Sequence, residues 1–190
     1  MVKNILITGA SGLCGNILSE GLTKLGYKII PCDKNSKPST AAKTLQISSN
    51  QKIKIVDLRN MKQVMKATKG VSAVIHFGGI PRHKPKEDNY KDIINHNIIG
   101  TYNIFEASRI NKVKRIIFAS SAHVVGYHNR KNILDERCEL RPDSHYAVSK
   151  CFGESLSRLY ADKYNIKSMS IRIGSALPKP TDHRFLSTWI

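Results

Sequence analysis

The stretch NILITGASGLCG, residues 4–15, places a short apolar run directly before three closely spaced glycines. The run contains β-branched residues and stops at a glycine, which is typical of a buried strand. Gly9, Gly12 and Gly15 then predict a tight turn into a helix. Bare N–H groups at a helix N-terminus suit a phosphate, so the stretch indicates a dinucleotide pyrophosphate site. Glycines also serve ordinary turns, so the rest of the chain must decide between these two readings.

Composition limits the class of protein. The 190 residues suffice for one domain with a sizeable core, and no apolar run is long enough to span a bilayer. Met1 leads almost directly into the first strand, without the pattern of a signal peptide. The four cysteines show no metal-ligand spacing, as expected of reduced thiols. We therefore expect a soluble, cytoplasmic protein with no membrane contact, no disulfide framework and no metal site.

The formal net charge of +17 raises the question of an anionic partner. The lysines are scattered along the chain, and no dense basic block interleaved with aromatic residues occurs. Solvated lysine-bearing surfaces are therefore favoured over a nucleic-acid site. Part of the charge can also steer an anionic cofactor or a small anionic substrate.

Strand and helix patterns alternate after the glycine turn. Apolar residues at helical spacing predict a helix over 16–25, and Gly26 follows as a C-terminal cap. Further strands are predicted at 27–33, 52–58, 71–79, 114–121 and 168–174, and further helices at 60–70, 90–110 and 144–164. This alternation requires crossover connections, so we predict an α/β fold with a doubly wound parallel sheet, the Rossmann fold.

Asp33 ends the second predicted strand and supports a dinucleotide over an ordinary turn. An acidic side chain at this place accepts hydrogen bonds from the adenosine ribose hydroxyls. It also repels a 2′-phosphate and so favours NAD over NADP, although the neighbouring Lys34 works against this preference. The alternative for Asp33 is a carboxylate that only caps its own loop.

Tyr146 and Lys150 stand four residues apart in YAVSK, on one face of a predicted helix near its start. A free tyrosine has a pKa near 10, and a fixed cation one turn away would lower that pKa. Such a pair by itself is usually two surface residues. Here Ser120 and Ser121 end the fifth predicted strand, at the edge where open α/β sheets bind ligands. The combination indicates an acid/base site.

Together, TGxxGxxG at 8–15, Asp57-Leu58 after the third strand, the serine at 121 and YxxxK at 146–150 resemble the extended short-chain dehydrogenase/reductases, the NAD-dependent epimerase/dehydratase family. The resemblance covers the whole chain. It implies that Tyr146 is the catalytic acid/base, that Lys150 lowers the pKa of Tyr146 and holds the nicotinamide ribose, and that Ser121 orients the substrate oxygen. With NAD as cofactor, the expected cofactor-site residues are Gly9, Ser11, Gly12, Leu13, Gly15, Asp33, Asp57, Leu58, Phe77, Gly78, Asn97, Tyr146 and Lys150.

Five segments are similar to the uronate dehydrogenases within that family: HFGGI, NIIGTYNIFEA, FASSAHVVGY, RPDSHYAVSKCFGE and RIGSALPKP with RFLSTW. Members oxidise the anomeric carbon of glucuronate or galacturonate to an aldarolactone with NAD. The resemblance implies that His123, Ser175 and Arg184 line the sugar site together with Ser121 and Tyr146. Arg184 would grip the carboxylate, because a planar guanidinium binds a carboxylate through two hydrogen bonds.

Some features keep other functions open. Ala122 follows the serine, as in many sugar-nucleotide epimerases, and Pro81 replaces a substrate-contacting serine expected after GGI. The family also continues well past residue 190. We therefore expect an NAD-binding Rossmann domain over 1–175 and the start of a truncated substrate-binding segment over 176–190. The alternatives are a sugar-nucleotide epimerase or dehydratase, or a non-catalytic NAD-binding protein, and association into a homo-oligomer stays open.

Overall fold

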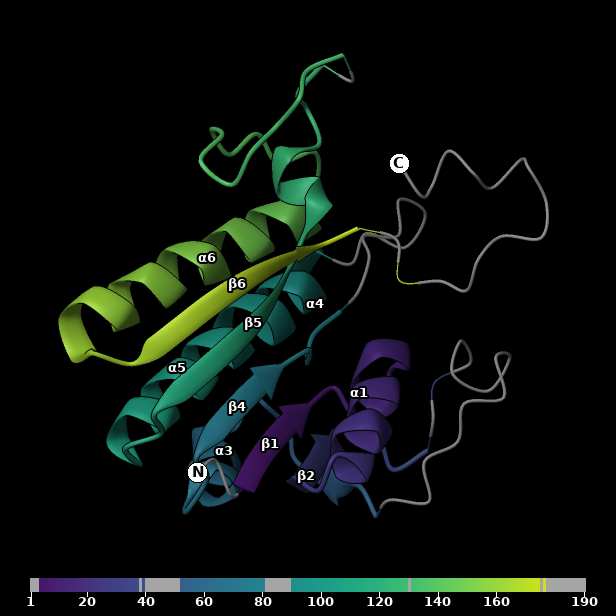
Figure 1. Ribbon diagram of the computed structural model, residues 1–190, viewed down its shortest axis with the longest axis vertical. Coiled ribbons are helices and arrows are strands. Elements are labelled where there is room, and N and C mark those ends of the chain that lie inside the picture. The colour runs from purple at the N-terminus through teal and green to yellow at the C-terminus, as the bar shows by residue number, and fades with distance from the viewer. Residues whose placement is uncertain are drawn as a thin grey trace.

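The computed structural model describes residues 4–37, 39, 52–80, 90–129, 131–174 and 176, in which strands and helices alternate along the chain (Figure 1). The strands pair in parallel in one sheet, with the order β3-β2-β1-β4-β5-β6. They are β1 (Asn4–Thr8), β2 (Lys28–Asp33), β3 (Lys54–Ile55), β4 (Ala73–His76), β5 (Arg115–Ser121) and β6 (Lys167–Ile173). The order reverses direction between β1 and β4, which confirms the doubly wound Rossmann fold.

The helices differ from the sequence prediction mainly in one place. They are α1 (Leu13–Lys24), α3 (Met61–Thr68), α4 (Tyr90–Ile93), α5 (Gly100–Ile110) and α6 (His145–Tyr164), with a π-helix at Ile94–Ile99 and a 3₁₀ helix at Ala122–Val125. The helix predicted over 90–110 is therefore α4, the π-helix and α5 in direct succession. Periodicity does not separate a π turn from the α-helix around it, because the turn adds only one residue per hydrogen-bonded ring.

The strand predicted over 52–58 is also shorter than expected. Only Lys54 and Ile55 pair, and they pair with β2 at the edge of the sheet. The chain then turns, with the N–H of Asn60 donating to the carbonyl of Asp57 at 3.0 Å. Within the described part of the chain, β3 therefore has a strand partner on one side only and ends after two residues. Such short strands are common at sheet edges.

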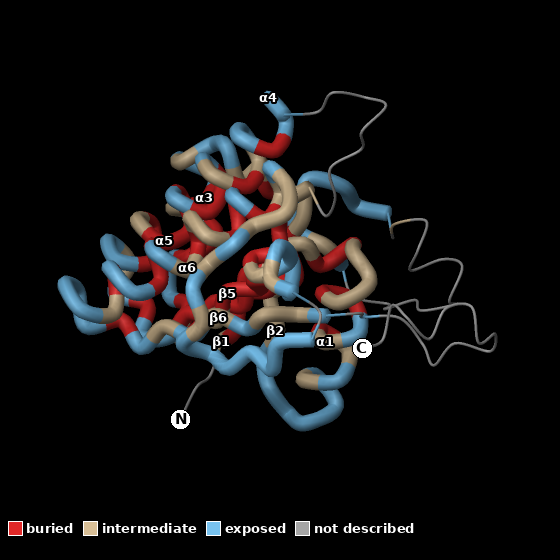
Figure 2. The backbone as a smooth tube through the Cα atoms, turned by 90° about the horizontal axis from the view of Figure 1, so that it is seen from above, coloured by how far each residue is buried: buried red, intermediate tan, exposed pale blue. Residues whose placement is uncertain are grey.

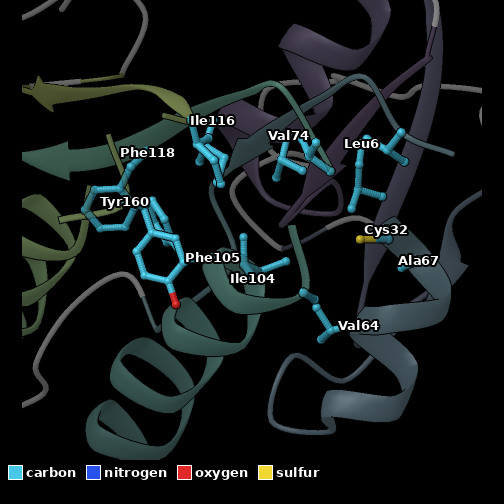
Figure 3. Close-up of a cluster of buried hydrophobic side chains, with 14 of the residues drawn as sticks. Leu6, Cys32, Val64, Ala67, Val74, Ile104, Phe105, Ile116, Phe118 and Tyr160 are labelled. Atoms are coloured by element: carbon cyan, nitrogen blue, oxygen red, sulfur yellow. The ribbon is translucent and has the colours of Figure 1, made fainter. Parts of the chain in front are cut away.

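The core has two layers, one on each face of the sheet. Because successive side chains of a strand point to opposite faces, Ile5 and Ile7 of β1 pack on the α1 side and Leu6 packs on the other. Figure 3 shows the larger layer, in which Leu6 belongs to the same buried cluster as residues from α3, α5 and α6 such as Val64, Phe105 and Tyr160. Figure 2 shows the buried residues concentrated along the central strands and the inner sides of the helices.

Three further findings concern the described residues. None of their helices is long and apolar enough to cross a membrane. No group of three or more His, Cys, Asp or Glu side chains among them has the arrangement of a metal site. The four cysteines are all free thiols.

Candidate active site

The predicted glycine turn joins β1 to α1 and has the shape that an anion site needs. Gly9 has a φ of +71°, and a Cβ there would lie 2.8 Å from the backbone of Phe77 and Gly78. A Cβ on Gly15 would collide with the carbonyl of Gly9. Gly12 is the N-cap of α1 and has no side chain to cap the first turn. The uncapped helix N-terminus therefore fits a phosphate, and it lies beside the reversal point of the sheet.

Asp33 is held against this turn at the end of β2. Its Oδ2 accepts a hydrogen bond from the N–H of Ser11 at 3.1 Å, and its Oδ1 accepts one from the N–H of Asn35 at 3.2 Å. Lys34 points elsewhere, with its Nζ 3.4 Å from Nε2 of His96. Two residues predicted for the cofactor site, Ser11 and Asp33, are thus in direct contact.

A buried polar chain links the ends of β1 and β4. The Thr8 hydroxyl oxygen accepts the N–H of Gly78 at 3.0 Å and lies 2.7 Å from Nδ1 of His76, while Nε2 of His76 lies 3.0 Å from the hydroxyl of Thr101. Burial, with the nearby Lys150 as a second cause, lowers the pKa of His76 to about 3, so this imidazole is neutral at physiological pH. His76 is not among the residues expected at the site from the sequence. The sequence feature that could have indicated His76 is its position as the one polar residue at the end of the apolar run AVIH.

Asp57 and Leu58, both expected at the cofactor site, have different surroundings. The carboxylate of Asp57 accepts hydrogen bonds from Arg59, from Nη2 at 2.6 Å and from Nε at 3.0 Å, and this pairing lowers its pKa to about 2. Leu58 packs between the loop after β4 and the start of α5: a Cβ on Gly78 would collide with its side chain, and one on Gly100 would lie 3.1 Å from its Cβ.

Asn97 lies in the π-helix and fastens the loop after β4 to α6. Its Oδ1 accepts the N–H of Ile80 at 2.7 Å, and its Nδ2 donates to the carbonyl of Ile80 at 3.1 Å and to the hydroxyl of Ser149 at 3.0 Å. Ser149 in turn donates to the carbonyl of Tyr146 at 2.6 Å. Asn97 therefore connects the loop to the helical turn that carries Tyr146.

Ser121, Tyr146 and Lys150 come together at the carboxyl end of β5. Ser121 is near enough to Tyr146 to lower the pKa of its phenol, and Nζ of Lys150 lies 5.5 Å from the centroid of the Tyr146 ring. Lys150 is buried and donates to the carbonyl of Ala119 at 2.8 Å. The three residues expected to carry out the chemistry are thus neighbours.

The pKa of Tyr146 departs from the sequence expectation. Burial raises it above the ordinary value, and the nearby Ser121 acts in the opposite direction. We expected Lys150 to lower it. Burial also lowers the pKa of Lys150 itself, to about 8, so the same loss of solvent acts against both charged forms.

His123, a further residue of the expected sugar site, also lies beside Tyr146. Their rings meet edge to face, with centroids 6.1 Å apart. Nδ1 of His123 lies 2.6 Å from Oδ2 of Asp143, a residue that sequence reasoning missed. Ser175 and Arg184 lie outside the described residues.

A separate hollow of about 530 Å³ lies between α6 and β6. Glu154 and Arg172 form an ion pair in its wall, with Nη2 and Oε2 3.0 Å apart. It is lined by neither Tyr146 nor the glycine turn, and the chemistry described above does not involve it.

Comparison with known proteins identifies the class. Residues 5–190 match the model of the NAD dependent epimerase/dehydratase family, and the chain belongs to that family. It is 36% identical to a uronate dehydrogenase of Pseudomonas syringae pv. tomato and 38% identical to one of Pseudomonas putida, each over 99% of this chain. The chain spans 65% and 66% of the lengths of these relatives.

Solved structures of uronate dehydrogenase and of an epimerase are also similar to this chain. A variant of uronate dehydrogenase from Agrobacterium tumefaciens, complexed with NAD, superposes with a TM-score of 0.84 at 35% identity, over 99% of this chain and 67% of that one. The UDP-glucose 4-epimerase of Thermus thermophilus, also complexed with NAD, superposes with a TM-score of 0.78 at 25% identity, over 89% of this chain and 54% of that one.

Proposed function

We propose that this chain carries the cofactor half and the acid/base residues of an NAD-dependent dehydrogenase that oxidises a uronic acid at C1 to an aldarolactone. The observation that carries the proposal is the joint position of Ser121, Tyr146 and Lys150 at the carboxyl end of β5. The uronate dehydrogenases among the relatives support the substrate class. We further propose that residues 1–175 form the cofactor domain and that 176–190 begin the substrate-binding segment.

The proposed cofactor site uses residues already described. The N-terminus of α1 would hold the pyrophosphate, because Gly12 begins the helix without a side chain while Gly9 and Gly15 let the backbone of the turn pack closely. Asp33 would accept hydrogen bonds from the adenosine ribose, while Asp57, Leu58 and the loop after β4 would border the bound molecule. Once bound, NAD supplies a hydride acceptor.

The proposed chemistry is the removal of a proton from the anomeric hydroxyl. Ser121 orients that hydroxyl by a hydrogen bond, and Tyr146, in its deprotonated phenolate form, accepts the proton. Lys150 stabilises the phenolate from one helical turn away. His123, Ser175 and Arg184 are the proposed sugar contacts, with Arg184 on the carboxylate.

A sugar-nucleotide epimerase is the second candidate, because Ala122 follows Ser121 and because a UDP-glucose 4-epimerase is among the similar structures. An epimerase regenerates its oxidised cofactor within each cycle. A dehydrogenase accumulates reduced cofactor. The absorbance of NADH therefore separates the two candidates.

The test is an assay of the chain with NAD and a panel of free uronic acids. We expect NADH to accumulate with glucuronate or galacturonate. Tyr146→Phe keeps the ring and removes the acid/base, so turnover should fall by about 10²-fold or more while NAD affinity stays unchanged. Tyr27→Phe is the matched control, since Tyr27 directly precedes β2 and so lies at the amino ends of the parallel strands, away from the carboxyl end of β5.

Two results would contradict the proposal. One is a Tyr146→Phe variant that oxidises uronate at the unaltered rate. The other is epimerisation of a nucleotide sugar without accumulation of NADH, which would favour the second candidate.

A further inference from the structure

The loop before α6 is bound along the 3₁₀ helix that follows β5. The N–H of Arg141 donates to the carbonyl of Val124 at 2.9 Å, and the N–H of Asp143 donates to the carbonyl of His123 at 3.3 Å. The N–H of Tyr127 returns a bond to the carbonyl of Arg141 at 3.0 Å. These backbone bonds bring His123 and Asp143 together although they are 20 residues apart.

The carboxylate of Asp143 is held in one place. Its Oδ2 lies 2.6 Å from Nδ1 of His123, and its Oδ1 accepts the hydroxyl of Ser144 at 2.9 Å. Gly126 borders the same carboxylate so closely that a Cβ there would collide with it. The side chain is therefore enclosed by a hydrogen bond on each oxygen and by a residue without a side chain.

This contact decides where the proton of the imidazole lies. A carboxylate only accepts hydrogen bonds, so Nδ1 of His123 carries the proton and donates it to Asp143. In the neutral ring Nε2 then has a lone pair and acts as an acceptor. The side chain of His123 is 59% exposed and its ring stands against that of Tyr146, so this acceptor belongs to the surface where substrate would lie.

We propose that Asp143 is a positioning residue for the sugar: it holds His123 in the tautomer whose Nε2 accepts a hydrogen bond from the hydroxyl next to the reacting carbon. Ser121 and Tyr146 bind the anomeric hydroxyl in the proposed function. The imidazole of His123 lies against Tyr146, so the sugar group nearest to it is the adjacent hydroxyl, on C2. The identity of the sugar rests on the function proposed above. The tautomer of His123 does not depend on that function.

The tautomer is measured by long-range proton–nitrogen NMR of the ¹⁵N-labelled chain at pH 8, with His123 assigned by its loss in His123→Gln. We expect a protonated Nδ1 in the unaltered chain. Asp143→Ala should move the proton to Nε2, the form that free histidine prefers. Ser144→Ala is the matched control: it removes the other hydrogen bond of Asp143 and the N-cap of α6, and should leave the His123 signals unchanged.

The substrate part is tested by comparing glucuronate with 2-deoxyglucuronate. In the unaltered chain the deoxy sugar should lose about tenfold in kcat/KM, the size of one hydrogen bond. Asp143→Ala should lose about tenfold with glucuronate, mainly through KM, and should no longer distinguish the two sugars. A merely structural role of Asp143 would lower kcat/KM equally for both sugars.

The outcomes separate the two proposals. A proton on Nε2 in the unaltered chain, or an unchanged tautomer in Asp143→Ala, overturns the role of Asp143. Persistent discrimination between the sugars in Asp143→Ala overturns the assignment of the C2 hydroxyl. If the unaltered chain neither binds nor oxidises a uronic acid, the proposed function fails together with the assignment of the C2 hydroxyl. The ¹⁵N chemical shifts of His123 still decide whether Asp143 sets the tautomer.

Discussion

Lys150 carries a stability cost that should be visible in the pH dependence of unfolding. Burial lowers its pKa from an ordinary 10.5 to about 8. Between these values the unfolded chain keeps a proton that the folded chain has released, so the contribution of Lys150 to stability should rise with pH from about 8 to 10.5. Lys150→Met should therefore raise the free energy of unfolding at pH 7 by about 1 to 3 kcal/mol, and its advantage over the unaltered chain should shrink as the pH rises to 10.

Urea unfolding at pH 7 and at pH 10 measures both effects. Lys163→Met is the control, because Lys163 lies on the same helix and is exposed. A Lys150→Met variant that is less stable than the unaltered chain at pH 7 would mean that the bond to the carbonyl of Ala119 outweighs the burial of the charge.

At the scale of residues, the sequence could predict the contacts that follow from a fixed spacing along a helix or from the end of a strand. Tyr146 and Lys150 are one helical turn apart, and Ser121 and Asp33 end strands, so their neighbourhood follows once the fold is known. Asp143 was beyond reach because its contact with His123 depends on two loops lying against each other. The raised pKa of Tyr146 was beyond reach because burial is a property of the folded chain.

Among the elements, α6 packs closely against the sheet at Gly153. A Cβ there would collide with the ring of Phe118, which is 1% exposed and has no space to move into. Gly153→Ala should therefore destabilise the chain by about 1 to 3 kcal/mol, although alanine is the better helix former by about 1 kcal/mol. It should also lower activity, because the same helix carries Tyr146 and Lys150.

Gly21→Ala is the matched comparison for this prediction. Gly21 lies within α1, and a Cβ there would have nothing within 4 Å. Thermal unfolding should show this variant to be more stable than the unaltered chain, by up to about 1 kcal/mol. Equal effects of the two substitutions would mean that α6 can move away from β5 without loss.

Element types were easier to predict than element boundaries. The alternation of strands and helices was correct, since apolar periodicity reports which face is buried. The π-helix at Ile94–Ile99 and the early end of β3 depend on tertiary contacts. Asn97 makes three bonds to groups outside its own helix, and β3 lies at the sheet edge.

For the molecule as a whole, the outer strand β6 leaves apolar surface open. Met169 is 61% exposed and Ile171 is 45% exposed, and both belong to the same face of the strand. The double substitution Met169→Thr and Ile171→Thr should reduce the binding of an apolar fluorescent dye and any self-association, with stability changed by roughly 0.5 kcal/mol or less. Dye fluorescence and sedimentation velocity measure these properties.

The control here is Leu6→Ala, at a residue that is 0% exposed; it should cost about 2 to 5 kcal/mol. A double threonine variant that loses stability on that scale would show that the face of β6 is covered.

The expected contacts at Ser175 and Arg184 lie outside the described residues, so this part of the site stays a prediction.

The contact between Gly9 and the loop after β4 has a consequence for how the molecule is made. The glycine turn is completed by Phe77 and Gly78, some 70 residues downstream, and Thr8 holds that loop by its side chain as well as its carbonyl. During synthesis, the first strand, turn and helix leave the ribosome long before their counterpart exists. The proposed phosphate site at the glycine turn can form only once β4 has docked beside β1, so affinity for the nucleotide should arise late in folding, with the long-range parallel pairing.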